Sequence, residues 1–500
     1  MGEIRKQSII NSVFSYLGIA LGFVYLILLL PAALGKEELG LTRFILSVAT
    51  LLGTLFPAGL NSFVLRFFPR FRDPSSGHHG FIRLVALMAI GGFVLMCLLL
   101  WLLRAPLAHW YSGSALLLEY GYLVIPMSFA IGMFTVINAY TMSLFRSSMG
   151  VFLNDVFIRI LLVAIALLHL NGMISFRWFL FASVSAYVLL FVVLLVYVML
   201  IDKGMWSKID WTFIRKSEPR TFFTYLLYIA PASVASMALR QIDTAMLGSN
   251  LSAGEAMEGV AVFSLAYTLS VIIDTPAGAL SRITDAKIAD AIHRKDHDFT
   301  ARVYSSSVRL LTVIGGILLV GVVINLPNLW QIMADDYSTG TFVVYVLGFS
   351  AFINMATGVN GSLLSLSEHF RKVSVLLLGL ILFSVVLNAI LIPIYGIRGA
   401  AIASATAMIA YNIAKSWIVW REFGVQPIGR PLFITILLCA VVLGLNQWLP
   451  VLENPYFDTM YRSAIILLIY AFSCKWLGLI PEWDELRHTL RQRWARMKTR

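Results

Sequence analysis

The chain is dominated by long apolar stretches that short polar segments separate. Each stretch covers about 18 to 26 residues, the length at which an α-helix spans roughly 30 Å of hydrocarbon. Backbone amides in lipid must be paired within the same segment, and no stretch shows the two-residue alternation of a membrane β-barrel. The pattern therefore predicts an all-α integral membrane protein with about fourteen transmembrane helices.

The expected helices are spaced at regular intervals along the chain. The first, Ile9–Leu30, is longer than a signal-peptide core and has no clear cleavage site, so we expect it to be retained. The helices are expected near 9–31, 41–61, 81–104, 115–138, 151–170, 177–201, 222–248, 257–281, 303–326, 341–366, 372–394, 397–420, 431–450 and 459–480.

Composition supports the membrane class. Hydrophobic residues make up 59% of the chain and charged residues only 13%, against about 25% in soluble proteins. The formal net charge of +12 would suit nucleic-acid binding, but about 31 of the 38 Lys and Arg fall on one side of the predicted helices. The side with few cations holds Lys36, Arg43, Arg104, Arg177, Arg398 and Arg462. Such asymmetry is the positive-inside signal, so we expect both termini in the cytoplasm and no nucleic-acid partner.

Short sequence matches indicate an internal duplication. Pro57-Ala58-Gly59 recurs as Pro276-Ala277-Gly278, and three other matches follow in the same order at displacements of 219 to 224 residues. An even number of helices per repeat gives two parallel six-helix bundles. We expect an N-terminal lobe at 1–201, a cytosolic linker at 202–221, a C-terminal lobe at 222–420, and two additional helices with a basic cytosolic tail at 421–500.

Signatures of catalysis are missing from the sequence. Gly35-Lys36 lacks the other residues of a phosphate-binding loop, and the three cysteines are too widely spaced for a disulfide framework or a zinc site. His293 and His297 are four residues apart, but their charged neighbours favour a solvated helix over a metal site. The predicted outer loops, of which Asn325–Gly340 is the longest, leave little room for a catalytic domain. We therefore expect no enzyme activity, metal or cofactor.

Charged residues within the predicted helices are the candidates for function, because a charge at bilayer depth is costly unless it faces a wet cavity or a partner. Arg240 and Asp243 lie three residues apart on one helix, where they form either a structural ion pair or part of a translocation path. Asp274 precedes Pro276 and is a candidate for proton exchange. Further candidates, whose alternative is to extend to the cytosolic interface, are Arg66, Asp155, Arg159, Arg282 and Lys415.

Cations outnumber anions near the membrane. Arg and Lys in a cavity would suit a pyrophosphate headgroup, since the Arg guanidinium matches phosphate oxygens. The positive-inside rule explains part of the same excess, so this pattern alone leaves the substrate open.

An ordered set of motifs resembles the polysaccharide-transporter branch of the multidrug/oligosaccharidyl-lipid/polysaccharide exporter superfamily. The motifs extend over the first twelve predicted helices. They are Leu34–Leu41, Ala58-Gly59-Leu60, Arg66-Phe67-Phe68-Pro69, Gln241–Gly248, Gly259, Pro276, Ile288-Ala289-Asp290 and the Gly- and Ala-rich turn Pro393–Ala403. Small residues in that turn would allow close helix packing.

The resemblance implies two six-helix lobes around a central cavity and a flippase that moves polyprenyl-pyrophosphate-linked oligosaccharides across the bacterial inner membrane by alternating access. It also implies a monomer, H⁺ or Na⁺ as a coupling ion, and association with polysaccharide-assembly enzymes. Ile9–Leu30 lacks the acidic residue common in multidrug exporters and the arginines of peptidoglycan-precursor flippases. The alternatives are an ion-coupled multidrug antiporter of the superfamily and a membrane glycosyltransferase or ligase.

Overall fold

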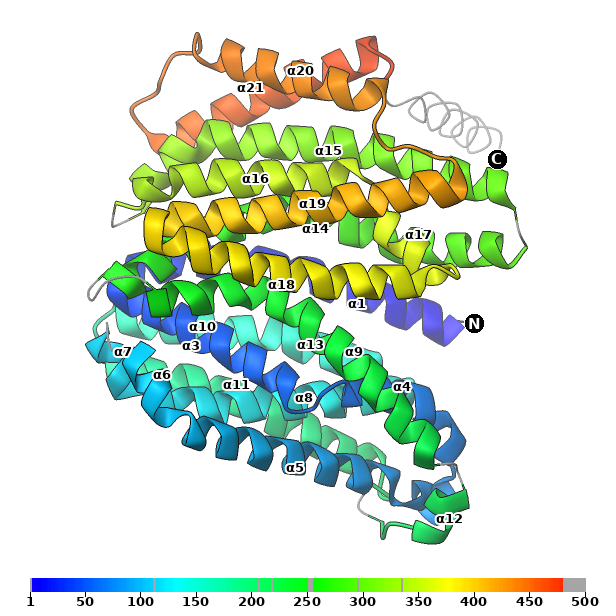
Figure 1. Cartoon of the computed structure of the whole chain (residues 1–500). Helices are drawn as coiled ribbons and strands as arrows, with labels where there is room; N and C mark the ends of the chain where they lie inside the picture. Colours follow the sequence, from blue (N-terminus) through cyan, green and yellow to red (C-terminus); the bar gives the residue numbers. More distant parts are fainter. Residues whose placement is uncertain are drawn as a thin grey trace, which may run out of the picture. The chain divides into compact units, whose positions relative to one another are not determined.

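The computed structural model describes residues 2–110, 114–205, 207–216, 219–250, 255–294, 296–333 and 336–479. Every regular element in these ranges is helical, in agreement with the all-α prediction (Figure 1). Contact clustering separates two compact units. The first comprises Met1–Leu265, Met333–Asp335 and Ile381–Ala400, and the second comprises Ala266–Ile332, Asp336–Leu380 and Ala401–Arg500.

The N-terminal half of the chain forms six successive helical segments. They are α1 (Gly2–Phe23) with η1 (Val24–Leu29) and α2 (Leu30–Ala33); α3 (Lys36–Leu55) with α4 (Leu60–Phe71); α5 (Phe81–Leu102) with α6 (Arg104–Trp110); α7 (Ala115–Tyr120), η4 (Gly121–Leu123) and α8 (Val124–Ser143); α9 (Ser147–Val151), η5 (Phe152–Phe157) and α10 (Ile158–Leu170); and α11 (Phe176–Ile201). The short 3-10 helices η2 (Pro74–Ser76) and η3 (His78–Gly80) lie between α4 and α5.

The remaining helices follow the predicted order. They are α12 (Trp211–Lys216), α13 (Pro219–Asn250), α14 (Glu255–His293), α15 (His297–Ile332), η6 (Ser338–Gly340), α16 (Thr341–Ala356), α17 (Asn360–Leu366), α18 (Phe370–Tyr395), α19 (Ile397–Phe423), α20 (Arg430–Asn446) and α21 (Pro455–Trp476). The predicted loop Asn325–Gly340 is wrong over its first half, because α15 continues through Pro327 to Ile332.

Within the residues that the structure describes, eleven helical segments are long and apolar enough to cross a membrane. The expected count of about fourteen is therefore not confirmed. Three predicted spans are not among these eleven segments. The helix α20 has 17 residues and is shorter than each of the eleven, whereas α13 and α19 carry polar groups such as Asp243 and Lys415 along their length. The chain is a multi-pass membrane protein.

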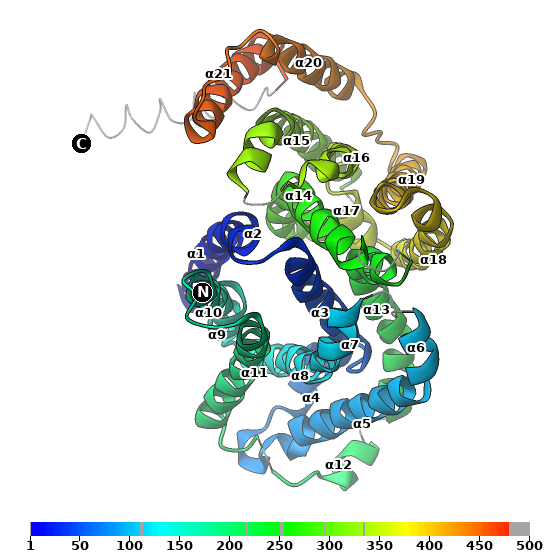
Figure 2. The same cartoon turned by 90° about the vertical axis from the view of Figure 1, so that its left-hand side faces the viewer.

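In the first unit, α8 is the central helix. It packs against α3, α4, α5 and α11, while α1 and η1 lie along η5 and α10 (Figure 2). The break between α3 and α4 falls at Gly59, whose φ of +81° favours glycine. Its repeat counterpart Gly278 lies within the continuous helix α14, so the two halves differ in backbone where their sequences match.

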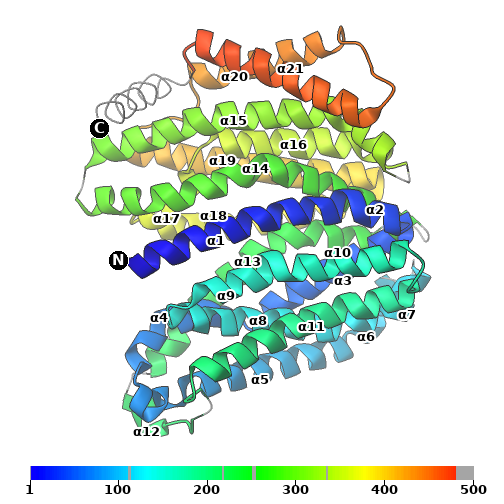
Figure 3. The same ribbon diagram turned by 180° about the vertical axis from the view of Figure 1, so that it is seen from behind.

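In the second unit, α20 and α21 pack along α15 (Figure 3). An apolar cluster with Val320, Val442 and Ile466 joins the three helices, and the Tyr470 hydroxyl donates to the Val313 carbonyl at 2.9 Å. Cys439 and Cys474 are buried in this cluster as unpaired thiols, where they pack as small hydrophobic residues. The two additional helices are therefore docked onto α15 by apolar packing.

Candidate functional site

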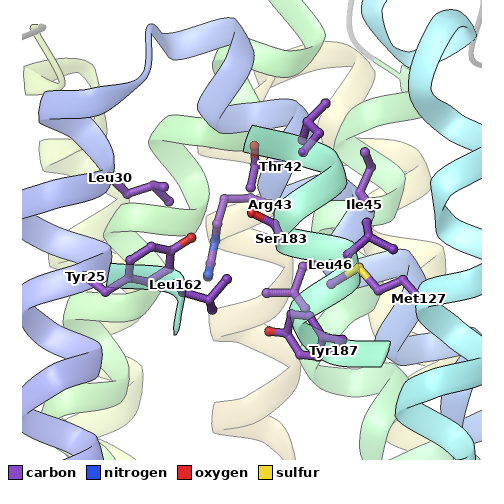
Figure 4. A pocket seen from close by; sticks show the side chains of 12 residues that line it. Tyr25, Leu30, Thr42, Arg43, Ile45, Leu46, Met127, Leu162, Ser183 and Tyr187 are labelled. Carbon is purple, nitrogen blue, oxygen red and sulfur yellow. The ribbon is translucent and has the colours of Figure 1, made fainter. Parts of the chain in front are cut away.

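A small cavity within the first unit surrounds Arg43 of α3. Figure 4 shows the Arg43 side chain extending into it, with Tyr25 of η1 and Tyr187 of α11 on either side. The cavity has a volume of about 30 Å³ and its lining also includes Thr42 and Ser183. About this much volume holds one water molecule. A guanidinium beside several hydroxyls in an otherwise apolar wall is a polar centre inside the helical bundle.

The sequence predicts a helix near 41–61, which puts Arg43 in its first turn, on the side with few cations. The helix begins at Lys36, so Arg43 lies two turns inside α3. A signal for this start is present in the sequence, because Glu37 and Glu38 stabilise the first turn through the helix dipole. Reading them as a helix start would have moved the predicted start back to Lys36 and placed Arg43 deeper in the membrane-spanning segment.

Asp243 belongs to a buried hydrogen-bonded pair in the same unit. Asn388 of α18 donates from Nδ2 to the Asp243 carboxylate at 2.7 Å, and the Ser384 hydroxyl lies at 3.4 Å from the same amide. Asp243 is 4% exposed, and Asn388 and Ser384 are more deeply buried. A carboxylate shielded from water needs hydrogen-bond donors such as these, because an unpaired buried charge is costly.

Two of the predicted site residues have side chains outside the described part of the structure. Arg240 lies on α13, one turn before Asp243, and Arg282 lies on α14; for both, only the helical backbone is described. The predicted pairing of Arg240 with Asp243 therefore stays a prediction.

The second unit holds a polar chain that crosses three helices. Asn354 of α16 donates to Asp274 of α14 at 2.5 Å, and the Thr357 hydroxyl donates to the Asn354 carbonyl at 2.8 Å. Thr357 continues the chain to the Asn412 side chain of α19 at 3.3 Å. Lys415, one turn further along α19, interacts electrostatically with Asp274.

Lys415 is only 6% exposed, with its ammonium group 4.3 Å from the Tyr411 ring centre. The alternative that it extends to the cytosolic interface is therefore wrong. A buried ammonium needs a counter-charge or an aromatic face, and Asp274 and Tyr411 supply both. The structure thus brings the half-buried Asp274 and the buried Lys415 into one polar network that the sequence had not linked.

Arg66 and Arg159 are placed differently. Arg66 is exposed on α4, with its guanidinium carbon 4.5 Å from the Tyr225 ring centre. Arg159 is 4.0 Å from Asp155, and both pack against the glycine face of α1, where a side chain on Gly18 or Gly22 would collide with Arg159. Ser15 of α1 donates to Asp155 at 2.8 Å. Asp155 and Arg159 therefore fix α1 in place.

Sequence reasoning gave little weight to His78 and His79, which join the α4–α5 loop to the segment before α13. His79 is 3.3 Å from Asp210, and its ring stacks on Phe213 at 3.8 Å between ring centres. His78 is buried, accepts from the Asp73 backbone N–H and lies 3.7 Å from Asp202. The predicted linker is thus tied to the first unit rather than loose.

The carboxylates of this contact are held in their charged form. The Ser75 hydroxyl donates to Asp73 at 2.6 Å, which lowers the pKa of Asp73. The hydrogen bond from the Phe213 backbone N–H lowers the pKa of Asp210, and the contact with His79 lowers it further. Across the described ranges, no group of three or more His, Cys, Asp or Glu could hold a metal ion.

The family comparison identifies one match. A family model described as "Polysaccharide biosynthesis protein" matches residues 4–276, which is more than half of the chain. No curated protein gives a significant match.

Solved structures share the fold at low sequence identity. A lipid II flippase, MurJ, in an inward closed conformation has a TM-score of 0.75 at 12% identity, covering 94% of this chain and 100% of that chain. An inward-facing multidrug resistance MATE family transporter of the MOP superfamily has a TM-score of 0.64 at 14% identity, covering 82% and 94%. A MOP superfamily transporter from Pyrococcus furiosus has a TM-score of 0.54 at 14% identity, covering 84% and 96%. The fold is that of MOP-superfamily transporters.

Proposed function

The chain belongs to the polysaccharide biosynthesis protein family, and from this premise we propose that it is a flippase for polyprenyl-pyrophosphate-linked oligosaccharides. The family match over residues 4–276 carries the proposal. The solved lipid II flippase has the same fold, which supports a lipid-linked precursor as substrate. The MATE-like structures support the alternative of an ion-coupled antiporter less well, because their fold is shared but the family match names polysaccharide biosynthesis.

The pyrophosphate is expected to interact with intramembrane cations. In this proposal Arg43 and Arg240 contribute to the translocation path, and Arg66 and Arg282 attract the headgroup at the cytoplasmic mouth. Arg is suited to phosphate because its planar donors match two oxygens. The lipid tail stays in the bilayer while the headgroup passes, so the protein needs to shield only the polar part. Asp155 and Arg159 support the path indirectly by positioning α1.

Coupling is assigned to the buried Asp243 and the half-buried Asp274. Asp243 with Asn388, and Asp274 with Asn354 and Lys415, change their local charge when a proton or Na⁺ binds. Such a change needs to shift the balance between inward- and outward-open states by only a few kcal/mol.

The lobes 1–201 and 222–420 are the moving parts in this scheme. The protein is proposed to act as a monomer in the bacterial inner membrane, with both termini cytoplasmic and in association with polysaccharide-assembly enzymes.

Complementation tests the proposal. The gene is expressed in strains that lack their own oligosaccharide-lipid flippase, and surface polysaccharide is scored across a panel of sugars. We expect rescue by the wild type for at least one sugar and loss of rescue by Arg43→Gln and Asp243→Asn at equal membrane abundance. Arg177→Gln is the control, because Arg177 lies at the start of α11. Drug efflux without rescue across the panel would overturn the proposal in favour of the antiporter.

A further inference from the structure

A basic groove lies between two helices of the second unit, away from the residues assigned to transport. It is formed by the start of α18 and the last turns of α19, and its volume is about 470 Å³. Its floor is apolar, with Val375, Leu376 and Ile418, while its rim carries Lys372, Arg421 and Glu422 next to Trp417. The apolar span of α18 begins at Val375, so the charged rim lies just beyond the end of that span.

Among the charged residues of the rim, Arg421 can bind an added anion. Glu422 is engaged by Lys372 at 2.6 Å and by His369 at 3.4 Å. Arg421 stacks on Trp417, with its guanidinium carbon 5.6 Å from the ring centre, and within the described part of the chain it donates no hydrogen bond. The single carboxylate of the groove is thus already compensated, while the five N–H donors of Arg421 are open to an added acceptor.

Apolar surface continues from the rim along the helices. Val375 and Leu378 of α18 are 68% and 47% exposed, and Trp417 and Trp420 of α19 are 52% and 49% exposed. Tryptophan is enriched at the boundary between hydrocarbon and headgroups, where its ring is apolar and its N–H is wet. A ligand that suits this site has an anionic head at the rim and an apolar tail along α18.

We propose that the α18–α19 groove binds an anionic phospholipid of the surrounding bilayer. The phosphate accepts hydrogen bonds from Arg421 and an ionic contact from Lys372, and an acyl chain covers Val375 and Leu378. Basic pockets between transmembrane helices bind anionic headgroups in this way. This site is distinct from the proposed flippase path, because none of its residues is assigned there, and it holds a resident lipid rather than cargo.

The test measures lipid retention by native mass spectrometry of the purified full chain after exchange into equimolar phosphatidylglycerol and phosphatidylcholine. We expect the wild type to retain phosphatidylglycerol in preference to phosphatidylcholine. Removing one cation near the membrane surface weakens binding about five-fold, so Arg421→Gln should lose about that factor in retained phosphatidylglycerol. The matched control is Arg104→Gln, because Arg104 also stacks on a tryptophan, Trp101, at 5.2 Å.

A second variant changes retention in the opposite direction. Glu422→Gln removes the carboxylate that competes for Lys372, so retained phosphatidylglycerol should increase. Equal loss in the Arg421 and Arg104 variants, or no change in either groove variant, would overturn the proposal. Inorganic phosphate is added in a separate arm; if it displaces the lipid at millimolar concentration, the groove recognises phosphate alone and the phospholipid assignment is wrong.

Discussion

Asp243 and Asn388 show what a single polar residue contributes within an apolar helix. The sequence identifies Asp243 as costly and therefore as a candidate, because a charge inside a membrane helix needs compensation. It does not identify Asn388, since one Asn among apolar residues is compatible with many partners. The 2.7 Å hydrogen bond depends on how α13 and α18 are brought together, more than a hundred residues apart in sequence.

This pair predicts an energetic coupling. Asn388→Ala leaves the buried Asp243 carboxylate without its amide donor, and Asp243→Ala leaves the amide without its acceptor. A hydrogen bond to a charged group contributes about 1.5 to 3 kcal/mol, so a double-mutant cycle on thermal unfolding in detergent should give a coupling energy of that size. Additive single-mutant effects would show that the two side chains act independently.

The His79–Asp210 contact predicts a pH dependence. Because its hydrogen bonds lower the pKa of Asp210, the carboxylate contributes fully above the usual pKa of an aspartate, and its contribution is lost as pH falls through the lowered value. Hydrogen exchange of residues 207–215, corrected for the intrinsic rate, should therefore be slow near neutral pH and become faster as the pH falls below the usual pKa of an aspartate. The lowered pKa of Asp73 acts in the same direction.

A variant separates this contact from general acid effects. Asp210→Asn should exchange near pH 7 as fast as the wild type does in acid, and Asp298→Asn, which lies in the second unit, is the control. Unchanged protection in Asp210→Asn would mean that the backbone contacts alone hold the segment.

At the element scale, the helices were predicted within a few residues in most cases. An apolar stretch long enough to cross a bilayer is helical, because its backbone must form its hydrogen bonds within the segment. The errors occur where polar residues continue a helix beyond the apolar stretch, as at Lys36–Arg43, or where proline suggests an end, as at Pro327. The ends of helices in water are set by capping groups and tertiary contacts, which the hydrophobic periodicity of the sequence does not show.

Close helix packing gives a prediction at this scale. A side chain on Gly40 of α3 would overlap the Met257 carbonyl of α14, whereas one on Gly91 of α5 would meet nothing within 4 Å. Gly40→Ala should therefore destabilise the protein by about 1 to 3 kcal/mol, as overpacking does, and Gly91→Ala should be neutral or slightly stabilising. Equal melting temperatures of the two variants in detergent would mean that α3 and α14 separate without cost.

For the whole molecule, the apolar helices and the family match indicate the same class of protein, a multi-pass membrane protein of the polysaccharide biosynthesis family. The sequence matches predicted a repeat, but the compact units do not follow the predicted lobes: α13 and residues Ile381–Ala400 cluster with the N-terminal half. Contacts between distant segments decide such grouping, and short sequence matches carry no information about them. The Pro393–Ala403 turn was predicted better, since Ala400, Ala401 and Ala403 are fully buried and a side chain on Gly399 would overlap the Leu391 carbonyl.

The proposed function, moving a lipid-linked oligosaccharide across a bilayer, can be measured on the purified protein. The most direct measurement reconstitutes the purified protein in liposomes loaded with a fluorescent lipid-linked oligosaccharide and adds a glycosidase that cannot cross the membrane. We expect wild-type vesicles to expose nearly all of the substrate to the enzyme, whereas empty vesicles and Arg43→Gln vesicles should expose only the outer-leaflet fraction. An exposed fraction in wild-type vesicles equal to that in empty vesicles, with several oligosaccharides and with an imposed proton or sodium gradient, would contradict it.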